Sequence, residues 1–239
     1  MPIRIGTPVW LLLGAFIGAS VPHTSFAGNQ IYEPLAASVQ SGLRAAIADR
    51  PAPNHGFTNS VQAANWLTEM SHRLERRIPG FETRLDFLRS THYEATRAGL
   101  DPQLLLAIIQ VESSFRKYAI SSAGARGFMQ VMPFWIGVIG RKNDNLFNLR
   151  TNLRYGCVIL RHYLDIEKGD QFRALGRYNG SLGKPEYPNM VMAALRTAWH
   201  YDHAIASIPG APAATTQDAA PKSVAAPVAA TITIQKTQR

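Results

Sequence analysis

Cysteine is almost absent from this sequence, since Cys157 is the only one among 239 residues. A single cysteine cannot form a disulfide within its own chain, so the fold must depend on an apolar core. Leu153, Cys157 and Leu160 lie at helical spacing, and we therefore interpret the thiol as a small buried hydrophobe. A nucleophilic cysteine would need a base beside it, and nothing in the sequence indicates one.

Acidic residues are also scarce, with 16 Asp and Glu against 25 Lys and Arg, which gives a formal net charge of +9. Such an excess attracts anionic partners, which include nucleic acid, a membrane surface or an acidic polymer. Long hydrophobic runs are missing as well. The apolar stretch from Val9 to Ala19 is shorter than the roughly 20 residues that a membrane-spanning helix needs.

The beginning of the chain favours one of these partners. Arg4 precedes the apolar stretch, and a small-residue site, Ser25-Phe26-Ala27, follows it. This order predicts a secretory signal peptide over residues 1–27, cleaved near Ala27. We expect a periplasmic protein with no stable membrane insertion after cleavage. Export argues against nucleic acid as a partner and favours a cell-wall polymer.

Sustained period-two alternation, the pattern of strands, does not occur either, whereas apolar residues recur at helical spacing. The expected fold class is therefore all-α. Asp101 and Pro102 mark one helix start as the N-cap and the first helical residue. The expected helices cover residues 60–78, 82–99, 102 to just beyond 112, 128–139, 149–167, 171–178 and 188–203.

Glu112 is the residue that fits this pattern least well. It follows Leu105 by seven positions and Ile108 by four, so the helical period places its carboxyl group on the apolar face. The helix is expected to end just after it, where the helix dipole disfavours negative charge. Burial and the dipole both raise the pKa of such a carboxyl group, as a general acid requires. Alternatively, Glu112 forms an ion pair with Arg116 or Arg126.

Three motifs follow one another in the order Glu112–Phe115, Ser121–Gln130 and Tyr178–Gly180. Their order and spacing resemble the soluble lytic transglycosylase (SLT) family, which has a goose-type-lysozyme-like helical fold. The resemblance covers about residues 82–203. Phe128 stands where leucine is usual, and the residues around Tyr178–Gly180 replace a more common alanine-flanked version.

The resemblance implies a role for each matching residue. Glu112 matches the catalytic acid and base, while the substrate-binding positions match Ser121, Gln130, Met132, Tyr178 and Asn179. Glu186 lies near a position where many members carry another glutamate, and we assign it no role. The chain then divides into a signal peptide (1–27), a helical extension (28–80), the SLT domain (81–205) and an Ala/Pro-rich flexible tail (206–239).

The family reaction implied is cleavage of the glycan strands of peptidoglycan, between N-acetylmuramic acid (MurNAc) and N-acetylglucosamine (GlcNAc). One glutamate acts first as acid and then as base, the product ends in 1,6-anhydro-MurNAc, and no metal or cofactor is needed. His200 and His203 have a spacing that can bind metal, but they lie at the expected end of the last helix, and we predict no metal site there.

Two alternatives remain open. A lysozyme-like muramidase would add water to the same bond and would need a second carboxylate near it, for which Asp101, Asp144 and Glu186 are candidates. A non-catalytic peptidoglycan-binding scaffold is the other. The small size and the appended tail suggest a further partner, a secretion, pilus or conjugation apparatus.

Overall fold

The computed structural model describes residues 29–48 and 60–202. The expected signal peptide, the tail from residue 206 onward and His203 lie outside the described residues. Within them the chain forms eight α-helices and one short π-helix, and its only β-pairings are isolated bridges. The all-α fold class is thereby confirmed. No helix in the described ranges combines the length and the apolar character needed to cross a membrane.

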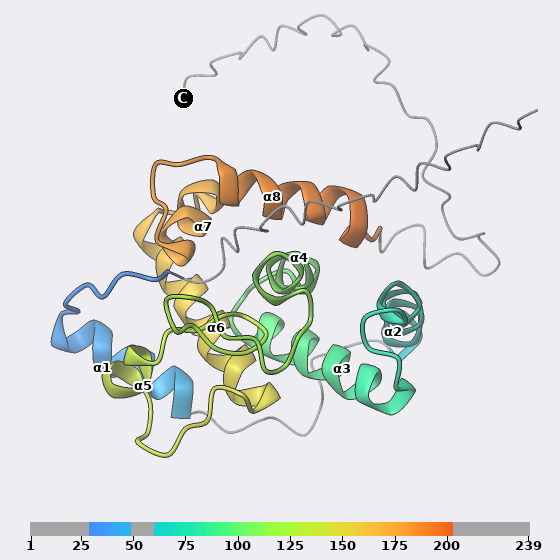
Figure 1. Cartoon of the computed structure of the whole chain (residues 1–239), viewed down its shortest axis with the longest axis horizontal. Coiled ribbons are helices and arrows are strands. Elements are labelled where there is room, and N and C mark those ends of the chain that lie inside the picture. The colour runs from blue at the N-terminus through green and yellow to red at the C-terminus, as the bar shows by residue number, and fades with distance from the viewer. Residues whose placement is uncertain (1–28, 49–59, 203–239) are drawn as a thin grey trace, which may run out of the picture.

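Figure 1 shows how the helices are arranged around α4, which lies at the centre beneath α8. Helices α3 and α6 pass below α4, with α1 and α5 on one side and α2 on the other. The bounds are α1 Ala37–Ala48, α2 Ser60–Leu74, α3 Phe81–Arg97, α4 Pro102–Ser113, α5 Phe134–Ile139, α6 Leu149–Ile166, α7 Gln171–Asn179, α8 Glu186–Ala194 and a π-helix Leu195–Trp199. The π-helix continues α8 without a break.

Helix starts agree with the capping signals in the sequence. The Asp101 side chain accepts a hydrogen bond of 2.8 Å from the Gln103 backbone N–H, and Pro102 is the first residue of α4. Asn148 and Asp170 cap α6 and α7 in the same way. These side chains satisfy backbone donors that have no partner inside the helix.

Helix α4 is buried on nearly all sides. Its core positions Leu105, Leu106, Ile108 and Ile109 are fully inaccessible to solvent, and α4 packs against α3, α8 and the π-helix. Burying each such side chain stabilises the fold by about 2 kcal/mol. The helix that carries Glu112 is therefore firmly held, and it can keep one polar side chain buried.

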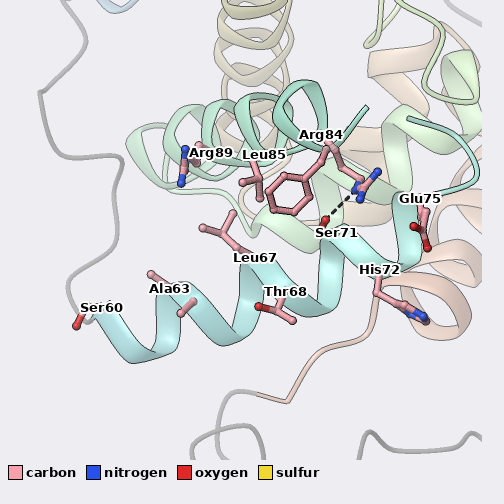
Figure 2. Close-up of a pocket in the computed structure, with 12 residues that line it drawn as sticks. Ser60, Ala63, Leu67, Thr68, Ser71, His72, Glu75, Arg84, Leu85 and Arg89 are labelled. Atoms are coloured by element: carbon pink, nitrogen blue, oxygen red, sulfur yellow. Dashed lines mark hydrogen bonds between the residues drawn. The ribbon is translucent and has the colours of Figure 1, made fainter. Parts of the chain in front are cut away.

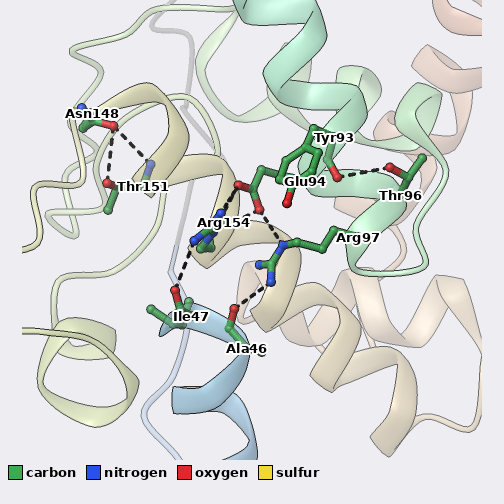
Figure 3. A network of polar contacts seen from close by, with 9 residues as sticks. All are labelled: Ala46, Ile47, Tyr93, Glu94, Thr96, Arg97, Asn148, Thr151 and Arg154. Carbon is green, nitrogen blue, oxygen red and sulfur yellow. Dashed lines mark hydrogen bonds and ion pairs between the residues drawn. The ribbon is translucent and has the colours of Figure 1, made fainter. Parts of the chain in front are cut away.

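A buried network of charges attaches α1 to this core (Figure 3). The Glu94 carboxylate, 1% exposed, pairs with Arg97 at 3.1 Å and with Arg154 at 2.8 Å. The same two guanidinium groups donate to the carbonyl oxygens of Ala46 and Ile47 at the end of α1, at 2.9 and 3.4 Å. The network thus joins α3, α6 and the last turn of α1.

Three predicted helices differ in their bounds, and the one expected over residues 60–78 ends at Leu74. The helix expected over residues 128–139 begins only at Phe134, because Gln130 adopts a left-handed φ of 48° and Arg126 pairs with Val131. The helix expected from residue 188 begins at Glu186 and becomes a π-helix at Leu195. The late start at Phe134 matters for function, because it turns the second motif into a folded loop.

Candidate active site

Glu112 is the second-last residue of α4 and lies in the interior. The residue is only 3% exposed, which confirms the buried position that the helical period predicted. The chain turns sharply directly after it, since Ser114 and Phe115 have φ values of 48° and 64°. Left-handed conformations cost energy in non-glycine residues and occur preferentially at functional sites. The carboxyl group is thus held at a helix end by a strained turn.

Tyr187 provides a direct partner for this carboxyl group. Its hydroxyl donates a hydrogen bond of 2.7 Å to Oε1 of Glu112, from the second residue of α8. Burial raises the pKa of Tyr187 well above its ordinary value, and negative charge on Glu112 raises it further. The phenol therefore stays protonated and remains a donor. Sequence reasoning considered the neighbouring Glu186 and missed Tyr187.

The second motif forms a tight loop against α6. Gly127 has a φ of 76°, and a Cβ atom there would lie 2.5 Å from both the Asn152 amide nitrogen and the Leu146 carbonyl oxygen. Only glycine fits this position, because the backbone needs both the left-handed conformation and the close approach. The buried Gln130 side chain closes the loop by donating to the carbonyl oxygens of Ala119 and Gly127, at 3.1 and 2.9 Å.

Three side chains fix this loop beside Glu112. The Ser113 hydroxyl donates to the Phe128 carbonyl at 2.7 Å, and the Tyr178 hydroxyl donates to the Met129 carbonyl at 2.8 Å. The side chain of Asn152, fully buried in α6, accepts from the Met129 N–H at 2.8 Å. The three motifs therefore meet through α4, α6 and α7. Asn152 also escaped sequence reasoning, since it reads as an ordinary polar residue of a helix.

The predicted substrate-binding residues lie around this loop. Tyr178 and Asn179 are buried at the end of α7, and negative charge on Glu112 is one of the influences that raise the pKa of Tyr178, after burial. Ser121 and Met132 are half-buried at the two ends of the loop. The Ser121 hydroxyl accepts from the Ala125 N–H at 3.1 Å.

One polar atom of the Asn179 side chain makes no hydrogen bond among the described residues. Its amide nitrogen donates to the Ser181 hydroxyl at 3.1 Å, whereas its buried Oδ1 atom has no hydrogen-bond partner among the described residues. Buried acceptors are nearly always paired in native proteins, so an open one at this place is notable.

The two arginines that were alternative partners for Glu112 each make another contact. The Arg116 Nε donates to the Ser113 carbonyl at 3.0 Å. The Arg126 guanidinium lies 5.9 Å from the centre of the Phe147 ring. Elsewhere, burial raises the pKa of the Cys157 thiol well above its ordinary value, which fits the interpretation of this residue as a buried hydrophobe.

A separate hollow of about 670 Å³ lies between α2 and α3 (Figure 2). Leu67 of α2 and Leu85 of α3 line it, and Arg84 crosses its end to donate to the Ser71 hydroxyl at 2.7 Å. None of the predicted site residues belongs to this hollow. Across residues 29–48 and 60–202, no three His, Cys, Asp or Glu side chains gather in a way that would hold a metal ion.

Comparison with known proteins agrees with this geometry. The family model of the transglycosylase SLT domain matches residues 90–188, a range that contains all three motifs and Tyr187. Membrane-bound lytic murein transglycosylase C of Haemophilus influenzae (strain PittGG) is 34% identical over 37% of this chain and 29% of its own length. The protein of that name from Histophilus somni (strain 2336) is 38% identical over the same shares.

A third relative with that name, from Actinobacillus pleuropneumoniae serotype 5b, is 39% identical over 28% of this chain and 20% of its own. The chain thus spans less than a third of the length of these relatives. Motif order, helical fold and family match agree, and residues 90–188 form a domain that matches the transglycosylase SLT family.

Proposed function

We propose that this protein is a peptidoglycan lytic transglycosylase that cleaves the β-1,4 bond between MurNAc and GlcNAc, with Glu112 as general acid and then general base. The observation that carries the proposal is a carboxyl group, 3% exposed, at the end of α4, with the Tyr187 hydroxyl 2.7 Å away. The family match and the names of the relatives, all lytic murein transglycosylases, support the same reaction.

The first step is proton donation by Glu112. Burial and the negative end of the α4 dipole both disfavour the charged form of the carboxyl group, and we propose that Glu112 enters the reaction protonated. The proton goes to the glycosidic oxygen, the bond from that oxygen to C1 of MurNAc breaks, and the oxygen keeps the electron pair. The carbonyl oxygen of the MurNAc N-acetyl group stabilises the positive charge that develops at C1.

The second step restores the acid. The Glu112 carboxylate now takes the proton from the C6 hydroxyl of the same MurNAc, and the C6 oxygen forms a bond to C1. The product ends in a 1,6-anhydro ring, and Glu112 is again protonated. Water is not consumed, and no step needs a metal or a cofactor. One carboxyl group suffices because the substrate itself supplies the nucleophile, whereas ordinary glycosidases use two.

The residues around the loop are proposed to hold the sugars. We propose that Ser121 and Gln130 line a substrate cleft beside Glu112, and that Met132, which is half-buried, packs against a sugar face. Tyr178 and Asn179 orient Glu112 and the N-acetyl sugar. The open acceptor on Asn179 suits an acetamido N–H, because a polar ligand would supply the hydrogen bond that it does not make within the described protein.

A muramidase that adds water is the second candidate, and the position of Glu186 is the observation that supports it. Asp101 caps the opposite end of α4, and the Asp144 carboxylate accepts from the Tyr155 hydroxyl at 2.5 Å. Glu186 is exposed and directly precedes Tyr187, so it is the carboxylate best placed to activate a water. The transglycosylase is favoured because the family carries out its reaction with one glutamate.

Two variants separate these candidates. We expect Glu112→Gln to abolish the clearing of cell-wall suspensions, by at least about a thousandfold, since the amide cannot donate and accept the proton. Glu186→Gln should keep activity within about twofold of wild type, because the substrate replaces a second carboxylate. A Glu112→Gln protein that clears walls at the wild-type rate would contradict the proposal. Loss of activity in Glu186→Gln would favour the muramidase.

Location and partners follow as proposals from the sequence. The leader-like residues 1–27 favour export to the periplasm, where peptidoglycan lies. The net charge of +9 suits a polymer whose peptide stems carry carboxylates. A role in opening the wall for a secretion, pilus or conjugation apparatus would be contradicted by a tail fragment, residues 206–239, that recovers no envelope component in a pull-down.

A further inference from the structure

The segment before α1 lies against the candidate active site. Residues 29–36, which we call the amino-terminal strap, have no regular secondary structure and run from α1 to the end of α7 (Figure 1). The Asn29 N–H donates to the Asn179 carbonyl at 3.3 Å. The Gln30 side chain donates to the Gln130 carbonyl at 3.3 Å and accepts from the Met132 N–H at 3.1 Å. Three predicted site residues, Gln130, Met132 and Asn179, are thus in contact with two residues of the strap.

Further along, the strap makes another contact on each side. The Tyr32 ring packs edge-on against Phe134, the first residue of α5, with ring centroids 5.6 Å apart. Glu33 forms an ion pair of 3.3 Å with Arg177 of α7. Gln30 and Tyr32 therefore contact the loop and α5, while Asn29 and Glu33 contact α7. The strap bridges the second and third motifs and does not merely lie over one of them.

The fit of the strap is close enough to constrain the third motif. Gly180 has a φ of 75°, and a Cβ atom there would lie 1.9 Å from the Asn29 carbonyl oxygen. Any other residue at position 180 would push the strap away. Gln30 itself is only 3% exposed, and it is one of the side chains that influence the pKa of Tyr178. A buried amide that donates to one backbone atom and accepts from another holds its part of the strap, and with it the neighbouring Asn29, at a set distance from the loop.

We propose that Gln30 is a positioning residue of the active site, which sets the distance between the Gln130–Met132 wall and the Tyr178–Asn179 wall. This inference rests on the proposed function. The Tyr178–Met129 hydrogen bond joins the walls at one point. The strap joins them again, because Asn29 bonds to Asn179 while Gln30 bonds to Met132, the residue that is proposed to pack against a sugar. Without Gln30, the Met132 N–H loses its hydrogen-bond partner, and the two walls of the proposed sugar-binding surface are no longer held at a fixed distance.

A matched pair of variants tests this role in the full chain. Gln30→Met keeps the length of the side chain and removes both hydrogen bonds. Gln40→Met is the control, because the Gln40 amide likewise joins the amino-terminal part to a distant carbonyl, that of Val138, at 2.7 Å. We expect Gln30→Met to lower kcat/KM on soluble glycan strands about tenfold, mainly through KM, and Gln40→Met to stay within about twofold of wild type.

Two further measurements separate positioning from simple loss of stability. The thermal midpoints should fall by similar amounts in Gln30→Met and Gln40→Met, and only Gln30→Met should speed hydrogen exchange at the Met132 amide. Gln30→Glu keeps the acceptor for Met132, so its KM should lie between those of wild type and Gln30→Met. Equal kinetics in Gln30→Met and Gln40→Met, beside an active wild type, would overturn this inference alone. A wild type without turnover would overturn the proposed function and this inference together.

Discussion

A single hydrogen bond, from the Tyr187 hydroxyl to Oε1 of Glu112, connects the start of α8 with the end of α4. Because burial and the nearby carboxylate raise the pKa of Tyr187, the phenol remains a donor across the neutral range. A donated hydrogen bond favours the charged form of a carboxyl group, whereas burial and the helix end favour the neutral form. The proposed acid is thus balanced between opposing influences, as a group that must both give and take a proton requires.

Removal of this donor should change the pH dependence in a known direction. In Tyr187→Phe the Glu112 carboxylate loses a stabilising partner, so its pKa rises and the alkaline limb of the kcat profile moves to higher pH. A hydrogen bond to a charged group is worth about 1.5–3 kcal/mol, and kcat at the optimum should fall about ten- to hundredfold.

Tyr163→Phe serves as the control, because Tyr163 is a buried tyrosine of α6 whose pKa is raised to about 12 by burial and by Glu33, with Arg177 opposing. Its pH profile should match that of wild type. An alkaline limb that stays in place or moves to lower pH in Tyr187→Phe would show that the phenol does not act on the carboxyl group.

At the scale of helices, α1 is held by charge rather than by apolar packing alone. Only Ile47 of this helix is buried, whereas Glu94, Arg97 and Arg154 join its last carbonyl groups to α3 and α6 (Figure 3). Removing one partner from a buried ion pair is far more costly than the pair is worth, because it leaves charge without compensation. Helix α1 follows the strap directly, so this network also anchors the strap.

Glu94→Gln should therefore lower the free energy of unfolding by about 3 kcal/mol, since two mostly buried guanidinium groups lose their counter-charge. Asp165→Asn is the comparison, because its ion pair with Arg161 at 2.6 Å is solvent-exposed and should contribute less than about 1 kcal/mol. Urea unfolding of both variants measures the difference. Equal losses of unfolding free energy in the two variants would mean that the buried network stabilises the fold no more than an exposed ion pair does.

The helices also show what local sequence signals can predict. The capping residues and the apolar period predicted that α4 starts at Asp101–Pro102 and ends just beyond Glu112. Both bounds were confirmed. The loop ahead of α5 was assigned to a helix because Phe128, Met129 and Val131 are as apolar as helical residues. What prevents a helix there is tertiary, namely the Asn152 and Tyr178 hydrogen bonds that hold the Met129 backbone.

At the scale of the whole molecule, the site is assembled from residues far apart in the chain. Tyr187 lies 75 positions from Glu112, and Gln30 lies 100 positions from Gln130. Periodicity and motif order predicted the all-α fold and the family, and both were confirmed. They carry no information on which distant side chains meet, so Tyr187, Asn152 and Gln30 were missed. The roles assigned to Ser121, Gln130, Met132, Tyr178 and Asn179 stay predictions.

The most direct test of the proposed chemistry is the mass of the fragments that purified protein releases from peptidoglycan. Because the C6 hydroxyl of MurNAc closes the ring, we expect fragments that end in 1,6-anhydro-MurNAc, and none from Glu112→Gln under the same conditions. Fragments with reducing ends, heavier by one water, would contradict the proposal, as would anhydro fragments released equally well by the Glu112→Gln protein.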